Sequence, residues 1–345
     1  MMYASILFAL IYVFVLSAIG TAVIDIIFRF LGKRGYMGNL FPNVRGGIPR
    51  AVGIIPFIIL SFYMLPGFNN LILIIGISAL IDDVLGRKKS PFGIEWGQLS
   101  RGIGIFLVMI VGILEGLGVS AIFVALMVQP LNISDMQPGS ACIVTIIMSV
   151  LTILAMLLIG SVPYAELPAV YTPLLILVVC LGYSPLDFSG KIMLGEVGNH
   201  TFGVALGLAY FVLGGLLGVI VFGFLTTALI AFVRRHNLRV FFRQKLRILD
   251  PTFGDYFMDV LTGGGLGDLL RKWFLADRQY DVKNPILISL GFRRLLYNHG
   301  ISTQSSTCNY HQYLHEFILL YLNEEYGFLE HIFYDGMHMG CTITF

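Results

Sequence analysis

The sequence predicts an all-α polytopic membrane protein with about nine transmembrane helices and a cytoplasmic C-terminal domain. Hydrophobic residues make up 57% of the 345-residue chain and charged residues only 12%, whereas about a quarter of the residues in an ordinary soluble domain are charged. The mean hydropathy is +0.84, and so few charges cannot coat a soluble globule of this size. Charged residues are sparse up to Val233 and frequent from Arg234 onward. We therefore divide the chain into a membrane domain at residues 1–234 and a soluble domain at residues 235–345.

Apolar stretches separated by polar segments define the individual spans. A spanning helix needs about 20 mostly apolar residues, and fewer where neighbouring helices shield it. The first apolar run follows Met1 and Met2 with no basic residue before it, so we expect a retained span and not a signal peptide. The predicted spans are residues 4–30, 51–66, 69–84, 102–116, 118–133, 141–160, 166–183, 200–213 and 215–233.

The loop charges predict the orientation of these spans, because cytoplasmic loops carry an excess of Lys and Arg. When nine spans alternate, the loops on the opposite side contain Glu115 and Glu166 but no Lys or Arg. This asymmetry predicts an external N-terminus and a cytoplasmic tail of about 110 residues. The predicted cytoplasmic side carries Lys33, Arg34, Arg45, Arg50, Arg87, Lys88, Lys89, Arg101, Lys191, Arg234, Arg235 and Arg239.

Polar clusters between the apolar runs converge on the predicted cytoplasmic face. Carboxylates beside a membrane are costly unless they bind something. A hard divalent cation is the simplest shared occupant, since Mg²⁺ takes oxygen ligands from one or two carboxylates together with substrate phosphates; Mn²⁺ is the alternative ion. The clusters are residues 41–50, Asp82-Asp83, residues 132–139 with Asn132 and Asp135, and residues 195–200 with Glu196, Asn199 and His200.

Basic side chains and glycines in the same loops suit a pyrophosphate group. Arginine and lysine side chains neutralise phosphate charge. The glycines of Gly195-Glu196-Val197-Gly198 would let backbone N–H groups approach phosphate at a helix N-terminus. The basic candidates are Arg45, Arg50, Arg87, Lys88, Lys89 and Lys191.

The ordered set of motifs resembles the polyprenyl-phosphate N-acetylhexosamine-1-phosphate transferases, also grouped as glycosyltransferase family 4. This family includes the phospho-MurNAc-pentapeptide transferase of cell wall biogenesis. The resemblance covers roughly residues 30–235. Residues 43–49 look like the family's first cytoplasmic loop, and Ile81-Asp82-Asp83 looks like its aspartate pair. Residues 131–139 are similar to its Asn-x-x-Asp motif followed by Pro-Gly, and residues 183–207 resemble the segment that ends in Gly-Asp-x-Gly-Ser.

The resemblance implies the transfer of an N-acetylhexosamine-1-phosphate from a UDP-sugar to a polyprenyl phosphate, with release of UMP. It places Asp83, Asp135 and Glu196 around Mg²⁺ as metal ligands, with Asp82, Asp83 and Asp135 as the catalytic carboxylates. Asp82 would position or deprotonate the acceptor phosphate. The implied substrate-binding residues are Asn43, Arg45, Asn132, Lys191, Gly198, Asn199 and His200.

Several positions depart from the family pattern and keep an alternative function open. Glu196 stands in place of the usual aspartate, Asn199 in place of serine, and Gln98 where lysine is common. The family's histidine-rich loop is missing, with only His236 near its place. A degenerate homologue that binds nucleotide sugar or lipid carrier in a regulatory or scaffold role is therefore the second hypothesis.

A small transporter is the third hypothesis, since intramembrane carboxylates also mark ion pathways. Transport predicts mid-membrane carboxylates and repeated halves, whereas these carboxylates gather at one face without an internal repeat. The net charge of +2 is small and dispersed, which argues against a nucleic-acid partner. A homodimer, and a protein partner for the C-terminal domain, are left open.

Overall fold

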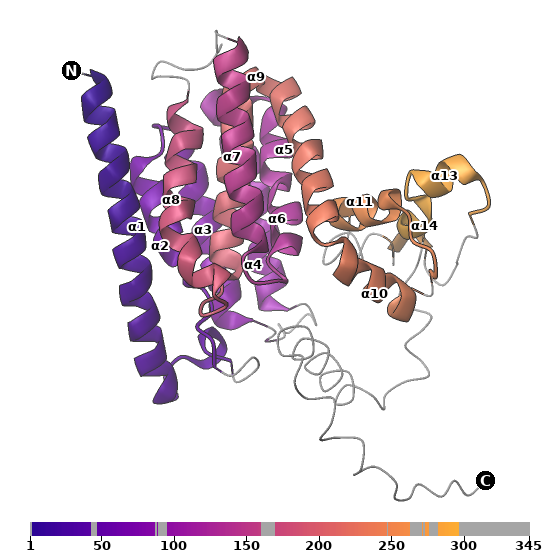
Figure 1. Cartoon of the computed structure of the whole chain (residues 1–345), viewed down its shortest axis with the longest axis horizontal. Coiled ribbons are helices and arrows are strands. Elements are labelled where there is room, and N and C mark those ends of the chain that lie inside the picture. The colour runs from indigo at the N-terminus through magenta and orange to yellow at the C-terminus, as the bar shows by residue number, and fades with distance from the viewer. Residues whose placement is uncertain are drawn as a thin grey trace, which may run out of the picture.

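Helices make up nearly all of the regular secondary structure in the part of the chain that the structure describes. This computed structural model describes residues 2–296, apart from 43–46, 87, 89–94, 160–169, 247, 263–270, 272 and 276–281. No β-strand occurs in those residues, and most of the helices form one upright bundle (Figure 1). The bundle helices are α1 (Met2–Lys33), α2 (Ile54–Tyr63), α3 (Phe68–Leu85), α4 (Trp96–Gly112), α5 (Ser120–Leu126), α6 (Val128–Ser134), α7 (Ser140–Ile159), α8 (Tyr171–Phe188) and α9 (Gly195–Val233), with short turns η1 (Gly38–Leu40) and η2 (Ile113–Leu117).

Length and hydropathy of these helices confirm the prediction of an all-α polytopic membrane protein. Among the described residues, six helices are long and apolar enough to cross a membrane. Their exposed side chains are largely apolar, as a lipid-facing surface requires; Phe8 on α1 is 72% exposed and Leu158 on α7 is 87% exposed. The six spans are Ile6–Lys33, Phe68–Leu85, Trp96–Leu117, Ser140–Ile159, Tyr171–Phe188 and Gly195–Val233, and the shorter apolar helices are Ile54–Tyr63 and Ser120–Ser134.

Helix α9 is a hairpin of two antiparallel halves. The hydroxyl groups of Tyr210 and Thr226 lie 2.8 Å apart, although 16 residues separate them in the chain. The reversal occurs at Gly215, whose φ of 59° is a left-handed conformation that favours glycine. The two halves correspond to the predicted spans at 200–213 and 215–233, which are joined by the reversal at Gly215.

The first half of α9 is the centre of the bundle. Its residues are buried almost without exception between Gly195 and Leu213, and α9 as a whole contacts α2, α3, α5, α6, α7, α8 and α11. Small residues permit this close packing. A Cβ atom on Gly203 would lie 2.8 Å from the carbonyl oxygen of Met127. The polar sequence that opens α9 is thereby fixed against the ends of its neighbours.

Three helix boundaries on the side of the polar clusters differ from the predicted ones by at least five residues. Helix α4 begins at Trp96 instead of residue 102, α8 continues to Phe188 instead of residue 183, and α9 begins at Gly195 instead of residue 200. Hydropathy places a span boundary where charged residues begin. Here Arg101 and Glu196 continue the helices because each has an ion-pair partner inside the bundle.

The first part of the C-terminal segment packs against the bundle. It contains α10 (Arg235–Lys245), α11 (Phe253–Thr262), α13 (Pro285–Ser289) and α14 (Phe292–Leu295). Helix α11 contacts both α9 and α6, and the rings of Phe224 and Phe257 stack at 5.9 Å. These helices lie on one side of the bundle in Figure 1. The predicted boundary at residue 234 coincides with the junction between α9 and α10.

Candidate functional site

Two loops that are distant in the sequence join in the candidate site through their backbones. The N–H groups of Val52 and Gly53 donate to the carbonyl groups of Met193 and Leu194 at 3.2 and 3.1 Å. In return, the N–H of Met193 donates to Pro49 at 2.9 Å. The loop that precedes α2 is therefore fixed to the start of α9. These are the first and last of the motifs that the sequence predicted to meet.

Asp83 caps the N-terminus of α9 from the end of α3. Its side chain is fully buried and accepts hydrogen bonds from the N–H groups of Glu196 at 3.1 Å and Val197 at 2.9 Å. The first N–H groups of a helix have no partner within the helix, and a carboxylate there is favoured by the helix dipole. The Nε atom of Arg50 lies 3.1 Å from the same carboxylate. We expected these N–H groups to face a phosphate, and the structure instead gives them to Asp83.

Arg101 connects Asp82, the other aspartate of the pair, to Glu196. Its Nε and Nη2 atoms donate to Oδ2 of Asp82 at 3.1 and 2.7 Å, and Nη2 lies 3.2 Å from Oε2 of Glu196. A Cβ atom on Gly97 would lie 2.0 Å from Oδ1 of Asp82, so glycine leaves the space that this carboxylate occupies. Arg101 was predicted only as a loop charge, and its place in the site is new.

Glu196 is the most highly connected carboxylate of the site. Besides Arg101, it faces Arg50 Nη2 at 3.5 Å and the fully buried His200 Nε2 at 3.2 Å. With the Asn132 amide oriented to satisfy both neighbours, its nitrogen donates to Glu196 at 3.0 Å and its oxygen accepts from Arg101 at 2.9 Å. Glu196, Asn132 and His200 therefore come together as the motif pattern suggested.

Asp135 lies at the end of α6 and forms a second part of the site. Its carboxylate accepts a hydrogen bond from the side-chain amide of Asn199 at 2.9 Å. The pKa of Asp135 lies well above its usual range, because burial disfavours the charged form and the nearby Asp187 repels it. Asp187 is 1% exposed, and one of its oxygens has no hydrogen-bond partner among the described residues. Asp187 lies outside the polar clusters from which the sequence predicted the other carboxylates of the site.

The donor chemistry of this cluster fits a hard divalent cation. Among the described residues, two guanidinium groups are ion-paired with three of the five carboxylates, and a cation would neutralise further negative charge. The described residues contain no ready-made group of three metal-ligating side chains. However, Mg²⁺ commonly takes only one or two carboxylates and completes its shell with water and substrate phosphates. The carboxylates are Asp82, Asp83, Asp135, Asp187 and Glu196, and the guanidinium groups belong to Arg50 and Arg101.

The other predicted site residues lie at the margin of the cluster or outside it. Lys191 is exposed, and its carbonyl accepts a hydrogen bond from the side chain of Arg29. Gly198 packs against Gly53, where a Cβ atom on Gly53 would lie 2.5 Å from the Gly198 Cα atom. The role of Gly198 in the structure is therefore close packing of two loops. Asn43 and Arg45 lie outside the described residues.

A scan against protein-family models and a search of curated proteins found no match to this chain.

Proposed function

We propose that this protein transfers an N-acetylhexosamine-1-phosphate from a UDP-sugar to a polyprenyl phosphate and releases UMP. The observation that carries the proposal is the Glu196 cluster. Guanidinium, amide and imidazole groups lie within 3.5 Å of the Glu196 carboxylate at one end of the bundle, and they come from three of the predicted motifs and from Arg101. An acceptor with a lipid tail requires a site at the edge of an apolar helical bundle, and this cluster lies at the ends of α3 and α6 and the start of α9.

The side chains of the site have distinct tasks in the proposed reaction. An oxygen of the polyprenyl phosphate attacks the β-phosphorus of the UDP-sugar, the bond from that phosphorus to the bridging oxygen breaks, and UMP leaves with this oxygen. Arg50 and Arg101 hold the phosphate oxygens. Asp82 orients the acceptor phosphate or takes its proton, while Asn132 and Asn199 orient the carboxylates beside them.

A bound Mg²⁺ would neutralise the negative charge of the phosphates and polarise the phosphorus. Asp83, Asp135 and Glu196 are the residues proposed to hold it, with Mn²⁺ as a substitute. Asp83 also caps α9, so its substitution tests structure and metal binding together. Asp135 and Glu196 separate the two effects better, because neither accepts a backbone hydrogen bond among the described residues.

The test is UMP release by the purified full chain supplied with Mg²⁺, undecaprenyl phosphate and UDP-N-acetylhexosamines. We expect release that requires both metal and lipid, and a loss of at least about 100-fold in Asp135→Asn and Glu196→Gln. Glu115→Gln is the matched control. This carboxylate also accepts a hydrogen bond, from Asn70 at 2.9 Å, but it is exposed and remote from the cluster. Equal activity of all three variants would contradict the proposal.

One feature of the site favours a second function, that of a degenerate homologue which binds nucleotide sugar or lipid carrier without turnover. Asp82, Asp83 and Glu196 are each within ion-pair distance of an arginine, and such pairing competes with a metal ion. This alternative predicts saturable binding of the UDP-sugar, measured by calorimetry, with no UMP release under any metal. Binding that is lost in Arg101→Gln would place the nucleotide sugar in this same site.

A further inference from the structure

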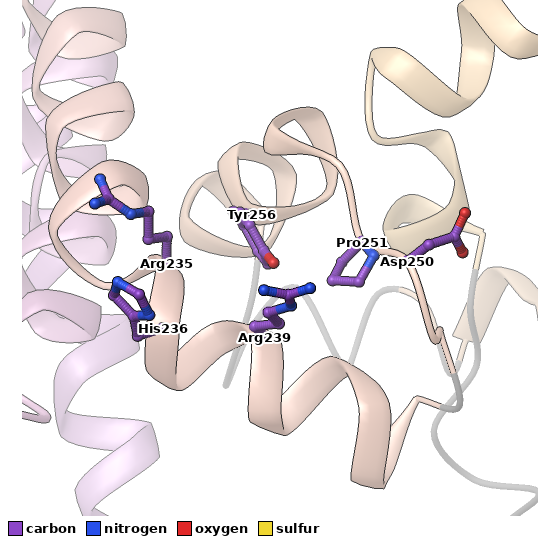
Figure 2. Close-up of a pocket in the computed structure, with 6 residues that line it drawn as sticks. All are labelled: Arg235, His236, Arg239, Asp250, Pro251 and Tyr256. Atoms are coloured by element: carbon purple, nitrogen blue, oxygen red, sulfur yellow. The ribbon is translucent and has the colours of Figure 1, made fainter.

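A pocket of about 370 Å³ lies where the last spanning helix ends. The apolar span finishes at Val233, so the pocket lies where the chain leaves the apolar layer. Figure 2 shows its walls, which come from α10, the connection that follows it and α11. None of the lining residues belongs to the Glu196 cluster. They are Arg235, His236, Arg239, Asp250, Pro251 and Tyr256.

The pocket is basic. Arg235, His236 and Arg239 all come from the first five residues of α10. This helix has neither an acidic residue in its first turn nor a side-chain cap, so its first N–H groups add partial positive charge. The one lining carboxylate, Asp250, has a side chain that is 90% exposed and faces Arg293 at 3.4 Å. Figure 2 shows it directed away from Arg239.

Tyr256 gives the second indication of a ligand. The residue is only 8% exposed, and its ring packs edge-on against Phe242 at 5.5 Å. Its hydroxyl group faces the guanidinium group of Arg239 in Figure 2, and both groups can donate hydrogen bonds to one anion placed beside them. Among the described residues, the Tyr256 hydroxyl has no hydrogen-bond partner and Arg239 no ion pair. The ring is fixed by its packing while the hydroxyl group lines the pocket, so an anion there would accept hydrogen bonds from both donors.

We propose that this pocket binds the phosphate group of an anionic phospholipid. Guanidinium groups bind phosphate oxygens through paired hydrogen bonds, and basic pockets at the membrane face bind lipid head groups. Arg235 lies 4.1 Å above the ring of Phe232, which is 56% exposed on the last turn of α9. This ring offers an apolar contact for an acyl chain beside the phosphate site. A phosphate ion from solution has the same binding chemistry but gains nothing from Phe232.

The experiment uses the full chain in phosphatidylcholine nanodiscs that contain a minor fraction of spin-labelled phosphatidylglycerol. The measurement is the ratio of protein-associated to free label. We expect the association constant to fall about tenfold in Arg239→Gln, which corresponds to about 1.4 kcal/mol, and severalfold in Tyr256→Phe and Arg235→Gln. Arg239→Lys keeps the positive charge, and its association constant should fall less than that of Arg239→Gln. Thermal unfolding of each variant verifies that it is folded.

Arg34→Gln is the matched control. Arg34 is also exposed, follows the end of α1 and lies 4.0 Å above the ring of Phe30, but it is outside the pocket. An equal loss in Arg34→Gln would assign the lipid preference to general interfacial charge and overturn the proposal. Equal binding of labelled phosphatidylcholine and phosphatidylglycerol by the unmodified chain would also overturn it. Stabilisation by inorganic phosphate that is lost in Arg239→Gln, without lipid preference, would keep the phosphate site and overturn the lipid assignment. None of these three results depends on UMP release.

Discussion

Gly53→Ala adds one methyl group at the point where the loop before α2 meets the start of α9. The new Cβ atom would lie 2.3 Å from the carbonyl oxygen of Leu194 and 2.5 Å from the Cα atom of Gly198. Ordinary van der Waals contacts begin at 3.4 Å, so the loop before α2 and the start of α9 must separate by about 1 Å. Gly53 has a φ of −58° and a ψ of −4°, which alanine adopts without strain. The effect is therefore steric and not conformational.

The expected magnitude follows from this displacement. Overpacking of a close-packed interior costs about 1–3 kcal/mol, and backbone obstacles that cannot rotate away favour the upper end. A shift of about 1 Å at a catalytic site costs about 100-fold in rate. Because Arg50 lies in the same loop and contacts Asp83 and Glu196, we expect both a lower Tm and a loss of UMP release.

Thermal unfolding in detergent, followed by circular dichroism, measures the first effect. Gly102→Ala is the control, since an added Cβ atom there meets nothing within 4 Å and alanine favours a helix. We expect a Tm decrease of about 5 °C or more for Gly53→Ala and no decrease for Gly102→Ala. Equal Tm values for the two variants and the unmodified chain would refute the packing of the two loops.

The remaining predictions concern three buried polar contacts. Arg101→Ala leaves Asp82 and Glu196 without this cation and should cost about 3–5 kcal/mol, seen as a large Tm loss that Arg101→Lys partly restores. Arg234→Gln weakens a hydrogen bond from the Arg234 side chain to the Ile133 carbonyl at 2.6 Å. Since Ile133 and Asn132 lie on the same helix α6, we expect UMP release to require a higher Mg²⁺ concentration. An unchanged Mg²⁺ requirement would show that Arg234 does not help to position Asn132. Tyr210→Phe removes the hydroxyl contact between the halves of α9 and should lower stability by about 1 kcal/mol in chemical denaturation; an unchanged midpoint would make this contact dispensable.

Hydropathy was sufficient to predict the helical bundle, because lipid requires apolar helices of a minimum length. The reversal within α9 also follows from the sequence, since the Gly214-Gly215 pair interrupts a long apolar run. The exact helix ends do not follow. Residues such as Arg101 look like loop residues in a hydropathy profile, and only the three-dimensional position of Asp82 explains why this arginine continues a helix.

The order of the motifs predicted most of the residues that meet in the site, including Asp83, Glu196 and Asn132. Arg101 and Asp187 were missed because each is a single charge next to an apolar run, with no neighbouring pattern to mark it. The cap formed by Asp83 on α9 could not be predicted either. A glycine-rich helix start indicates free N–H groups, but not which anion receives them; here a carboxylate from the same chain does so.

The fate of the β-phosphorus tests the central claim most directly. The full chain is incubated with Mg²⁺, undecaprenyl phosphate and a UDP-N-acetylhexosamine whose β-phosphate carries a radioactive label, and the lipid and water phases are then separated. The account predicts that the label moves into the lipid phase together with the sugar, while unlabelled UMP appears in the water phase. Label that stays in the water phase as UDP, or as intact UDP-sugar under every metal and lipid condition, would contradict it.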